Sequence, residues 1–195
     1  MIGAMIRSME ESGHGEAADA LRLAHDCYLR EHDFLQLTTD DVSDAGAGDL
    51  AIHIAYAKTG PRQGVRLDWS GTILMLQRRV KERGPGRRLF DLTGRSYLNA
   101  WHEAKNRIRH KIDPDFSIGP PHSVRHSGPS RDVADGDRSI WQIQRRGRWQ
   151  SESSVMRYAK TASWAAARAR SSQAVVAYGE PVLLQRGQRP EQPRE

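Results

Sequence analysis

Two short runs of β-strand character, LAIHIAYA (50–57) and GVRLDW (64–69), limit the fold most tightly. The segment KTGPRQ between them contains Gly60 and Pro61, which favour a turn, so we expect one antiparallel β-hairpin. The remaining periodic segments have apolar residues at helical spacing and good helix formers. We expect helices over residues 16–29, 71–83, 94–112, 139–147, 151–160 and 161–178, and one that begins near His122. The pattern predicts an α+β fold, mostly α-helical, with one small antiparallel sheet or hairpin.

The composition limits the class of protein. A chain of 195 residues is long enough for one globular domain with a real core. Its net charge is +6, with arginine far more frequent than lysine. An arginine-rich domain favours a polyanionic partner, most often nucleic acid, although an uneven solvated surface explains the charge equally well.

Several classes of protein are excluded by what the sequence lacks. Cys27 is the single cysteine, which excludes an internal disulfide framework and any zinc site built on cysteines. No apolar run approaches the roughly 20 residues that span a bilayer, and the N-terminus has no signal-peptide pattern. We therefore expect an intracellular protein without a membrane partner. The end of the chain, RGQRPEQPRE, has no apolar content and should be disordered.

The stretch PPHSVRHSGP (120–129) places His122, Arg125 and His126 together after two prolines. On a helix, residues three and four apart share one face, so such a group suits an anionic ligand as well as a solvated surface. We expect His126 to pack or cap nearby, because no metal-ligand cluster accompanies it. The helix after Arg125 should be interrupted by GPSRDVADGD (128–137), which is rich in Gly, Pro and Asp.

Several further residues of the chain could serve phosphate chemistry. Each of them alone has an ordinary structural explanation, but the order in which they follow one another along the chain does not. LREHDFLQLTTDDV, AYAKTGPRQG, PHSVRHSG and IQRRGRWQSESSVMRY together resemble the signature of the tyrosine recombinases, the phage-integrase family. In that signature an arginine is followed by a hairpin lysine, His-x-x-Arg, a His or Trp, and a nucleophilic tyrosine. The matching residues here are Arg30, Lys58, His122, Arg125, Trp149 and Tyr158.

The resemblance implies a tyrosine-recombinase catalytic-domain fold over residues 17–178, with a 1–16 N-terminal extension and a disordered 179–195 tail. It also implies roles at a DNA phosphodiester. Arg30 and Arg125 would hold the phosphate oxygens, and Tyr158 would attack the phosphorus to form a 3′-phosphotyrosine link.

Further roles follow from the same resemblance. His122 would take the tyrosine proton or position the phosphate, and Lys58 would protonate the departing 5′ oxygen. Trp149 would donate to a phosphate oxygen and support the site. Asp33 stands where the family commonly has a Glu, and would orient an arginine from behind. This chemistry needs no cofactor and no metal.

We therefore expect an enzyme that recombines or integrates DNA, from a mobile element, associated with double-stranded DNA and self-assembling on it. The family usually carries a further N-terminal helical domain, for which this chain has no room. This difference is explained if the chain is a fragment, if a separate arm-binding domain or protein supplies the missing part, or if the gene is a decayed remnant. Three alternatives stay open: a topoisomerase-like nicking and closing activity, a catalytically inactive DNA-binding relic, and a structural helical domain with a basic surface.

Overall fold

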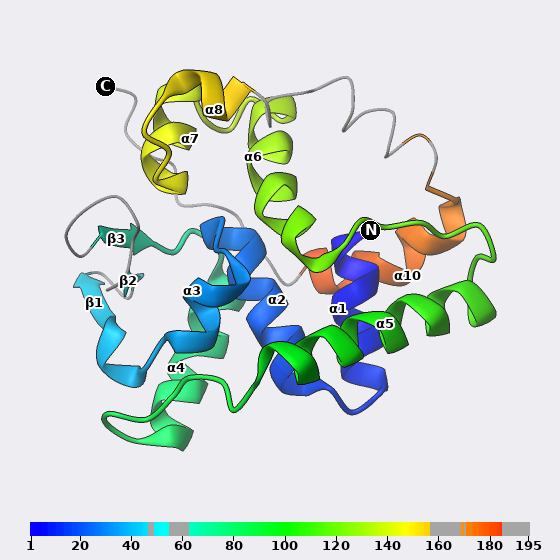
Figure 1. Ribbon diagram of the computed structural model, residues 1–195, viewed down its shortest axis with the longest axis horizontal. Helices are drawn as coiled ribbons and strands as arrows, with labels where there is room; N and C mark the ends of the chain where they lie inside the picture. The colour runs from blue at the N-terminus through cyan, green and yellow to red at the C-terminus, as the bar shows by residue number, and fades with distance from the viewer. Residues whose placement is uncertain (47–48, 55–62, 157–168, 170, 185–195) are drawn as a thin grey trace.

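The computed structural model describes residues 1–46, 49–54, 63–156, 169 and 171–184. Its described part is mostly helical with one three-stranded antiparallel sheet, as the sequence predicted (Figure 1). The α-helices are α1 (Ile2–Glu11), α2 (Gly15–Cys27), α3 (Glu31–Gln36), α4 (Ser70–Arg83), α5 (Gly94–Lys111), α6 (Val124–Ala134), α7 (Ile140–Gly147), α8 (Glu152–Met156) and α10 (Gln173–Leu184). Two 3-10 turns, η1 (Thr39–Asp41) and η2 (Pro121–Ser123), precede β1 and α6 respectively.

The sheet contains the predicted hairpin and one strand more. Strands β2 (Asp49–Ile54) and β3 (Gln63–Arg66) pair antiparallel, with Ile52 opposite Val65. Strand β1 (Val42–Gly46), which the sequence analysis missed, pairs with the other edge of β2, giving the order β1-β2-β3. β1 contains two glycine or aspartate positions near its end and a register irregularity, so it lacks the alternating pattern that identifies a strand.

The N-terminal helix belongs to the core. Residues 1–16, which we had set apart as an extension, hold α1, and Met5 and Met9 on it are fully buried. In Figure 1, α1 lies beside α10 and close to α5, and it packs against both helices. The first helix therefore supports the domain from within.

The C-terminal region differs from its prediction in two ways. A continuous helix over 161–178 is wrong, because Ser171 and Ser172 are not helical and α10 begins at Gln173. The same helix then continues to Leu184, beyond the predicted start of the tail. Val175 and Val182 are buried, so α10 is retained by packing on its own chain.

Helix α6 is not interrupted after Arg125, and that prediction was also wrong. It runs through Gly128 and Pro129 to Ala134. A Cβ at Gly128 would lie 2.6 Å from the carbonyl oxygen of His25, so the glycine is what allows α6 to approach α2 this closely. The contact with α2 outweighs the poor helix propensity of the two residues.

None of the helices in the described ranges is long and apolar enough to cross a bilayer.

Candidate active site

Asp33 is the carboxylate around which the candidate site is built. It lies in the first turn of α3 and accepts a hydrogen bond of 2.9 Å from the backbone N–H of Arg30, which satisfies a donor at the helix N-terminus. Its side chain is 4% exposed. There it accepts from Nη2 of Arg148 at 2.9 Å and lies 4.0 Å from Nη1 of Arg125. One buried carboxylate thus faces two arginines from different parts of the chain.

Arg125 is held in one orientation by three groups. It is buried in the first turn of α6 and donates to the backbone carbonyls of Tyr28, at 2.5 Å, and Gly147, at 2.6 Å. Its guanidinium also lies over the ring of Trp149, 4.8 Å from the ring centroid. These carbonyls come from the C-terminal ends of α2 and α7, where the last carbonyls of a helix have no partner within it. Arg125 therefore joins three helices at one point.

Trp149 follows α7 and is packed on its last residue. A Cβ at Gly147 would lie 1.7 Å from a ring carbon of Trp149, so only glycine admits the ring here. The half-buried indole packs near Tyr28, with 6.3 Å between ring centroids. This packing fixes the face that Trp149 presents to Arg125.

Among the members of the predicted set that the structure describes, Arg30 and His122 are exposed. Arg30 precedes α3, and its charge is one of the influences that lower the pKa of Arg148. His122 lies in η2, its ring 6.4 Å from that of His126. Burial is the main cause that lowers the pKa of His126, followed by the charges of Arg125 and His122. Arg30 therefore contacts the cluster through its backbone N–H on Asp33, whereas His122 lies beside His126, on which the charge of Arg125 also acts.

Lys58 and Tyr158 lie outside the described residues. The strands that flank Lys58 are described, and Ile54 at the end of β2 pairs with Gln63 at the start of β3. Tyr158 follows α8, which ends at Met156. The structure therefore brings together Asp33, Arg125 and Trp149 by direct contact.

The sequence analysis missed Arg148, the residue between Gly147 and Trp149. Its side chain is 4% exposed, and its backbone is left-handed, with φ 57° and ψ 41°. Burial lowers its pKa, and Arg30 and Arg146 add to that effect while Asp33 opposes it. The sequence carried one signal: an arginine stands where a helix end most often has glycine or asparagine.

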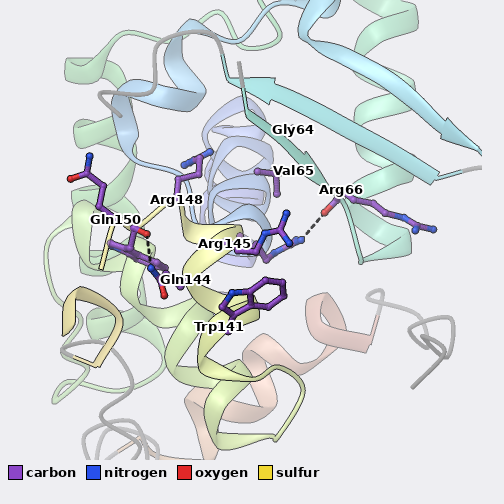
Figure 2. A pocket seen from close by; sticks show the side chains of 10 residues that line it. Gly64, Val65, Arg66, Trp141, Gln144, Arg145, Arg148 and Gln150 are labelled. Atoms are coloured by element: carbon purple, nitrogen blue, oxygen red, sulfur yellow. Dashed lines mark hydrogen bonds between the residues drawn. The ribbon is translucent and has the colours of Figure 1, made fainter. Parts of the chain in front are cut away.

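A pocket of about 530 Å³ lies between β3 and α7. Its wall includes Arg66, Trp141, Arg145, Arg146, Arg148 and Trp149. Figure 2 shows Val65 and Arg66 on the strand side, with Arg145 and Trp141 on α7. The lining is rich in arginine and tryptophan, which suits an anionic ligand with an aromatic or sugar portion. Among the described residues no group of His, Cys, Asp and Glu could hold a metal ion.

The comparison with known proteins finds a protein of similar fold but no relative that is similar in sequence. No protein-family model matches the chain, and no curated protein matches it. Among solved structures, the XerH site-specific recombinase bound to its difH substrate, in a pre-cleavage complex, matches with a TM-score of 0.62 and 16% identity. The match covers 87% of this chain and 51% of the XerH chain, so this chain spans about half the length of that protein. In fold, the chain is similar to the catalytic domain of a tyrosine recombinase.

Proposed function

We propose that this chain, with α1 and all of α10 included, forms the catalytic domain of a site-specific DNA recombinase, which cleaves and rejoins double-stranded DNA through a 3′-phosphotyrosine intermediate. The observation that carries the proposal is the cluster of Asp33, Arg125 and Trp149, which three separate segments of the chain build in a recombinase-like fold. These residues were selected from sequence order alone, and their direct contact supports a common role.

Arg125 suits a phosphate because its orientation is fixed before any ligand binds. The two backbone carbonyls and the Trp149 ring hold the guanidinium plane, and Asp33 lies behind it. A preorganised donor stabilises developing charge without reorganising during the reaction. Arg30, exposed at the start of α3, supplies the second positive charge on the phosphate oxygens.

In the proposed reaction, the phenol oxygen of Tyr158 attacks the phosphorus and the bond to the 5′ oxygen breaks. The phenol proton passes to His122, and Lys58 gives a proton to the departing 5′ oxygen. Rejoining reverses these steps with the 5′ hydroxyl of a second strand as the nucleophile. Arg30, Arg125 and Trp149 bind the non-bridging oxygens, whose charge increases in the transition state.

Such an enzyme has particular binding partners and a particular location in the cell. The domain binds double-stranded DNA, is found where DNA is, and assembles with further copies on paired sites. An arm-binding domain or protein completes its hold on the duplex. The net charge of +6 favours binding dominated by phosphate contacts, which weakens steeply as salt is added.

A nicked suicide duplex tests the reaction. Once such a substrate is cut, it loses a short fragment and leaves the protein trapped on the 3′ phosphate. We expect a covalent adduct with the wild-type chain and with Tyr97→Phe, because Tyr97 is buried in the hydrophobic core. Tyr158→Phe should bind the duplex and form no adduct, since only the attacking oxygen is removed. Binding without any adduct in the wild type would favour the inactive DNA-binding relic.

A further inference from the structure

Arg148 occupies a backbone conformation that a glycine would adopt more readily. It follows the last residue of α7 at φ 57°, where a Cβ crowds the backbone and glycine or asparagine is usual. If this position served only to end the helix, glycine would serve better. The arginine side chain must therefore have a role of its own.

The hydrogen bonding of the Arg148 side chain is incomplete. Nη2 donates to Asp33, whereas Nη1 is buried and has no hydrogen-bond partner within the described part of the chain. A buried N–H group of a cation without an acceptor is unfavourable, because its hydration has been lost and not replaced. The side chain is 4% exposed, so bulk water does not compensate.

The charges around Arg148 also call for an anion. Asp33 is shared with Arg125, whose Nη1 lies 4.0 Å away. Arg146, which is close enough to influence Arg148, pairs with two other carboxylates, Asp26 at 3.0 Å and Asp68 at 2.8 Å, and Asp68 is shared with Arg138. Exposed Arg30 adds a further positive charge near Arg148. Positive charge therefore exceeds negative charge at this point.

The pocket between β3 and α7 offers a place for that anion. Arg148 forms part of its wall, with Arg145 and Arg66 on the helix and strand sides (Figure 2). Its volume of about 530 Å³ admits a phosphate with part of its sugar. Arg145 is itself placed by stacking on the exposed ring of Trp141, 4.7 Å from the ring centroid.

We propose that Arg148 is a third phosphate-binding arginine, which keeps Nη2 on Asp33 and donates from Nη1 to a backbone phosphate of DNA in the pocket between β3 and α7. This inference rests on the proposed function in taking DNA as the ligand. It goes beyond it in assigning a phosphate contact to a residue outside the recombinase signature. The planar fork of arginine suits this double role, since it holds two acceptors at once.

The test is the salt dependence of equilibrium binding to a short duplex, measured by fluorescence anisotropy with three variants. Arg148→Gly removes the contact and fits the left-handed backbone, and buried Asp33 keeps the Arg30 N–H and the charge of Arg125, so the fold should persist. We expect its affinity at low salt to fall roughly 10-fold or more, since the lost hydrogen bond is charge-assisted. The plot of log affinity against log salt should become shallower by about 0.9, the loss of one phosphate contact.

Arg107→Gln is the matched control. Arg107 is paired with Glu11 at 2.8 Å on another part of the surface, so its loss should leave the slope within about 0.3 of the wild type. Arg148→Lys keeps the charge but has a compact ammonium in place of the fork. Because it cannot hold Asp33 and a phosphate together, it should bind more weakly than the wild type.

Nuclear magnetic resonance with inorganic phosphate separates this inference from the proposed reaction. The backbone amides of residues 147–149 should shift with added phosphate in the wild type and stay unchanged in Arg148→Gly. A folded Arg148→Gly protein with the wild-type salt slope and phosphate response would overturn the inference, even if the suicide substrate gives an adduct. A shallower salt slope and a missing phosphate response in Arg148→Gly would uphold the inference, even if the wild-type chain forms no adduct with the suicide substrate.

Discussion

Two regions of the molecule are stabilised by different interactions. The apolar half, formed by α1, α5 and α10, is built on fully buried Met5, Trp101, Ile108 and Val175. Its helices approach so closely that a Cβ at Gly179 would lie 2.5 Å from the backbone nitrogen of Ala4. Burial of apolar surface is the main favourable contribution to folding and depends little on direction. This half therefore stabilises the fold without imposing precise polar geometry.

The arginine half, formed by the end of α2, α3, residues 67–69, α6 and residues 140–150, is organised by buried ion pairs. Asp132 is 0% exposed and pairs with Arg131 and Arg138, and Arg138 also pairs with Asp68. Buried ion pairs give little net stability, because the charges lose their hydration. They do impose distances and directions, and this is the half that contains the candidate site. The comparison indicates that stability and site geometry are supplied by different regions.

The largest effect should come from removing the central anion of the arginine half. Asp132→Ala would take the carboxylate away from buried Arg131 and would leave half-buried Arg138 with Asp68 alone, and the Tyr28 hydroxyl would lose its acceptor. We expect a loss of about 3–5 kcal/mol in the free energy of unfolding, measured by urea denaturation. A loss below about 1 kcal/mol would show that the ion network is not a structural unit.

Removal of a buried side chain from the apolar half should lower the free energy of unfolding by a somewhat smaller amount. Ile108→Ala removes a fully buried side chain from α5, and we expect a loss of about 2–4 kcal/mol. Because no charge is involved, the loss should be the same in low and high salt. Ile108→Val, which removes one methylene, should lower the free energy of unfolding by only about 0.5–1.5 kcal/mol. A strong salt dependence of the Ile108→Ala effect would contradict the division between the halves.

The smallest of the three effects is a pH dependence of stability that arises from a buried carboxyl in the arginine half. Burial raises the pKa of Asp26 from 3.8 to about 6, although Arg146 opposes this. A carboxyl whose folded pKa is raised stabilises the fold fully below its unfolded pKa, and that stability is lost as pH rises through the folded pKa. The free energy of unfolding should therefore fall by roughly 2 kcal/mol between pH 4 and pH 7 on account of Asp26.

Asp26→Asn should remove this fall, since the amide does not titrate. The measurement is the urea midpoint at pH 4.5 and at pH 7 for both proteins. An unchanged pH dependence in Asp26→Asn would mean that another group is responsible. Asp132 acts in the opposite direction below about pH 4, because its neighbouring arginines and the Tyr28 hydroxyl hold its pKa at about 2 in spite of its burial.

The sequence predicted those parts of the molecule that depend on local pattern. The hairpin of β2 and β3 and the long helix α5 follow from periodicity and turn residues, and both are confirmed. The mostly helical fold class with one small sheet was predicted from periodicity and is confirmed. The similarity of the fold to a recombinase catalytic domain was predicted from the order of the motifs and is confirmed by the match to XerH. The roles of the six signature residues and Asp33 remain predictions.

What the sequence did not predict depends on tertiary contacts. Helix α6 continues through Pro129 because Gly128 packs on α2, and propensity contains no information about that neighbour. The burial of α1 depends on α10, which lies at the other end of the chain. Three tertiary features distinguish Arg148: its left-handed backbone, its bond to Asp33 and an Nη1 that has no hydrogen-bond partner among the described residues.

The central claim is that the arginine half faces DNA while the apolar half supports it from behind. Hydrogen exchange of the wild-type chain, with and without a saturating duplex at low salt, tests this most directly. Ordering of side chains and backbone by phosphate contacts should slow exchange in peptides from 28–36, 121–134 and 140–150. Peptides from α1 and α10 should exchange at the same rate in both samples. Protection concentrated on α1 and α10, with residues 121–150 unchanged, would contradict the account.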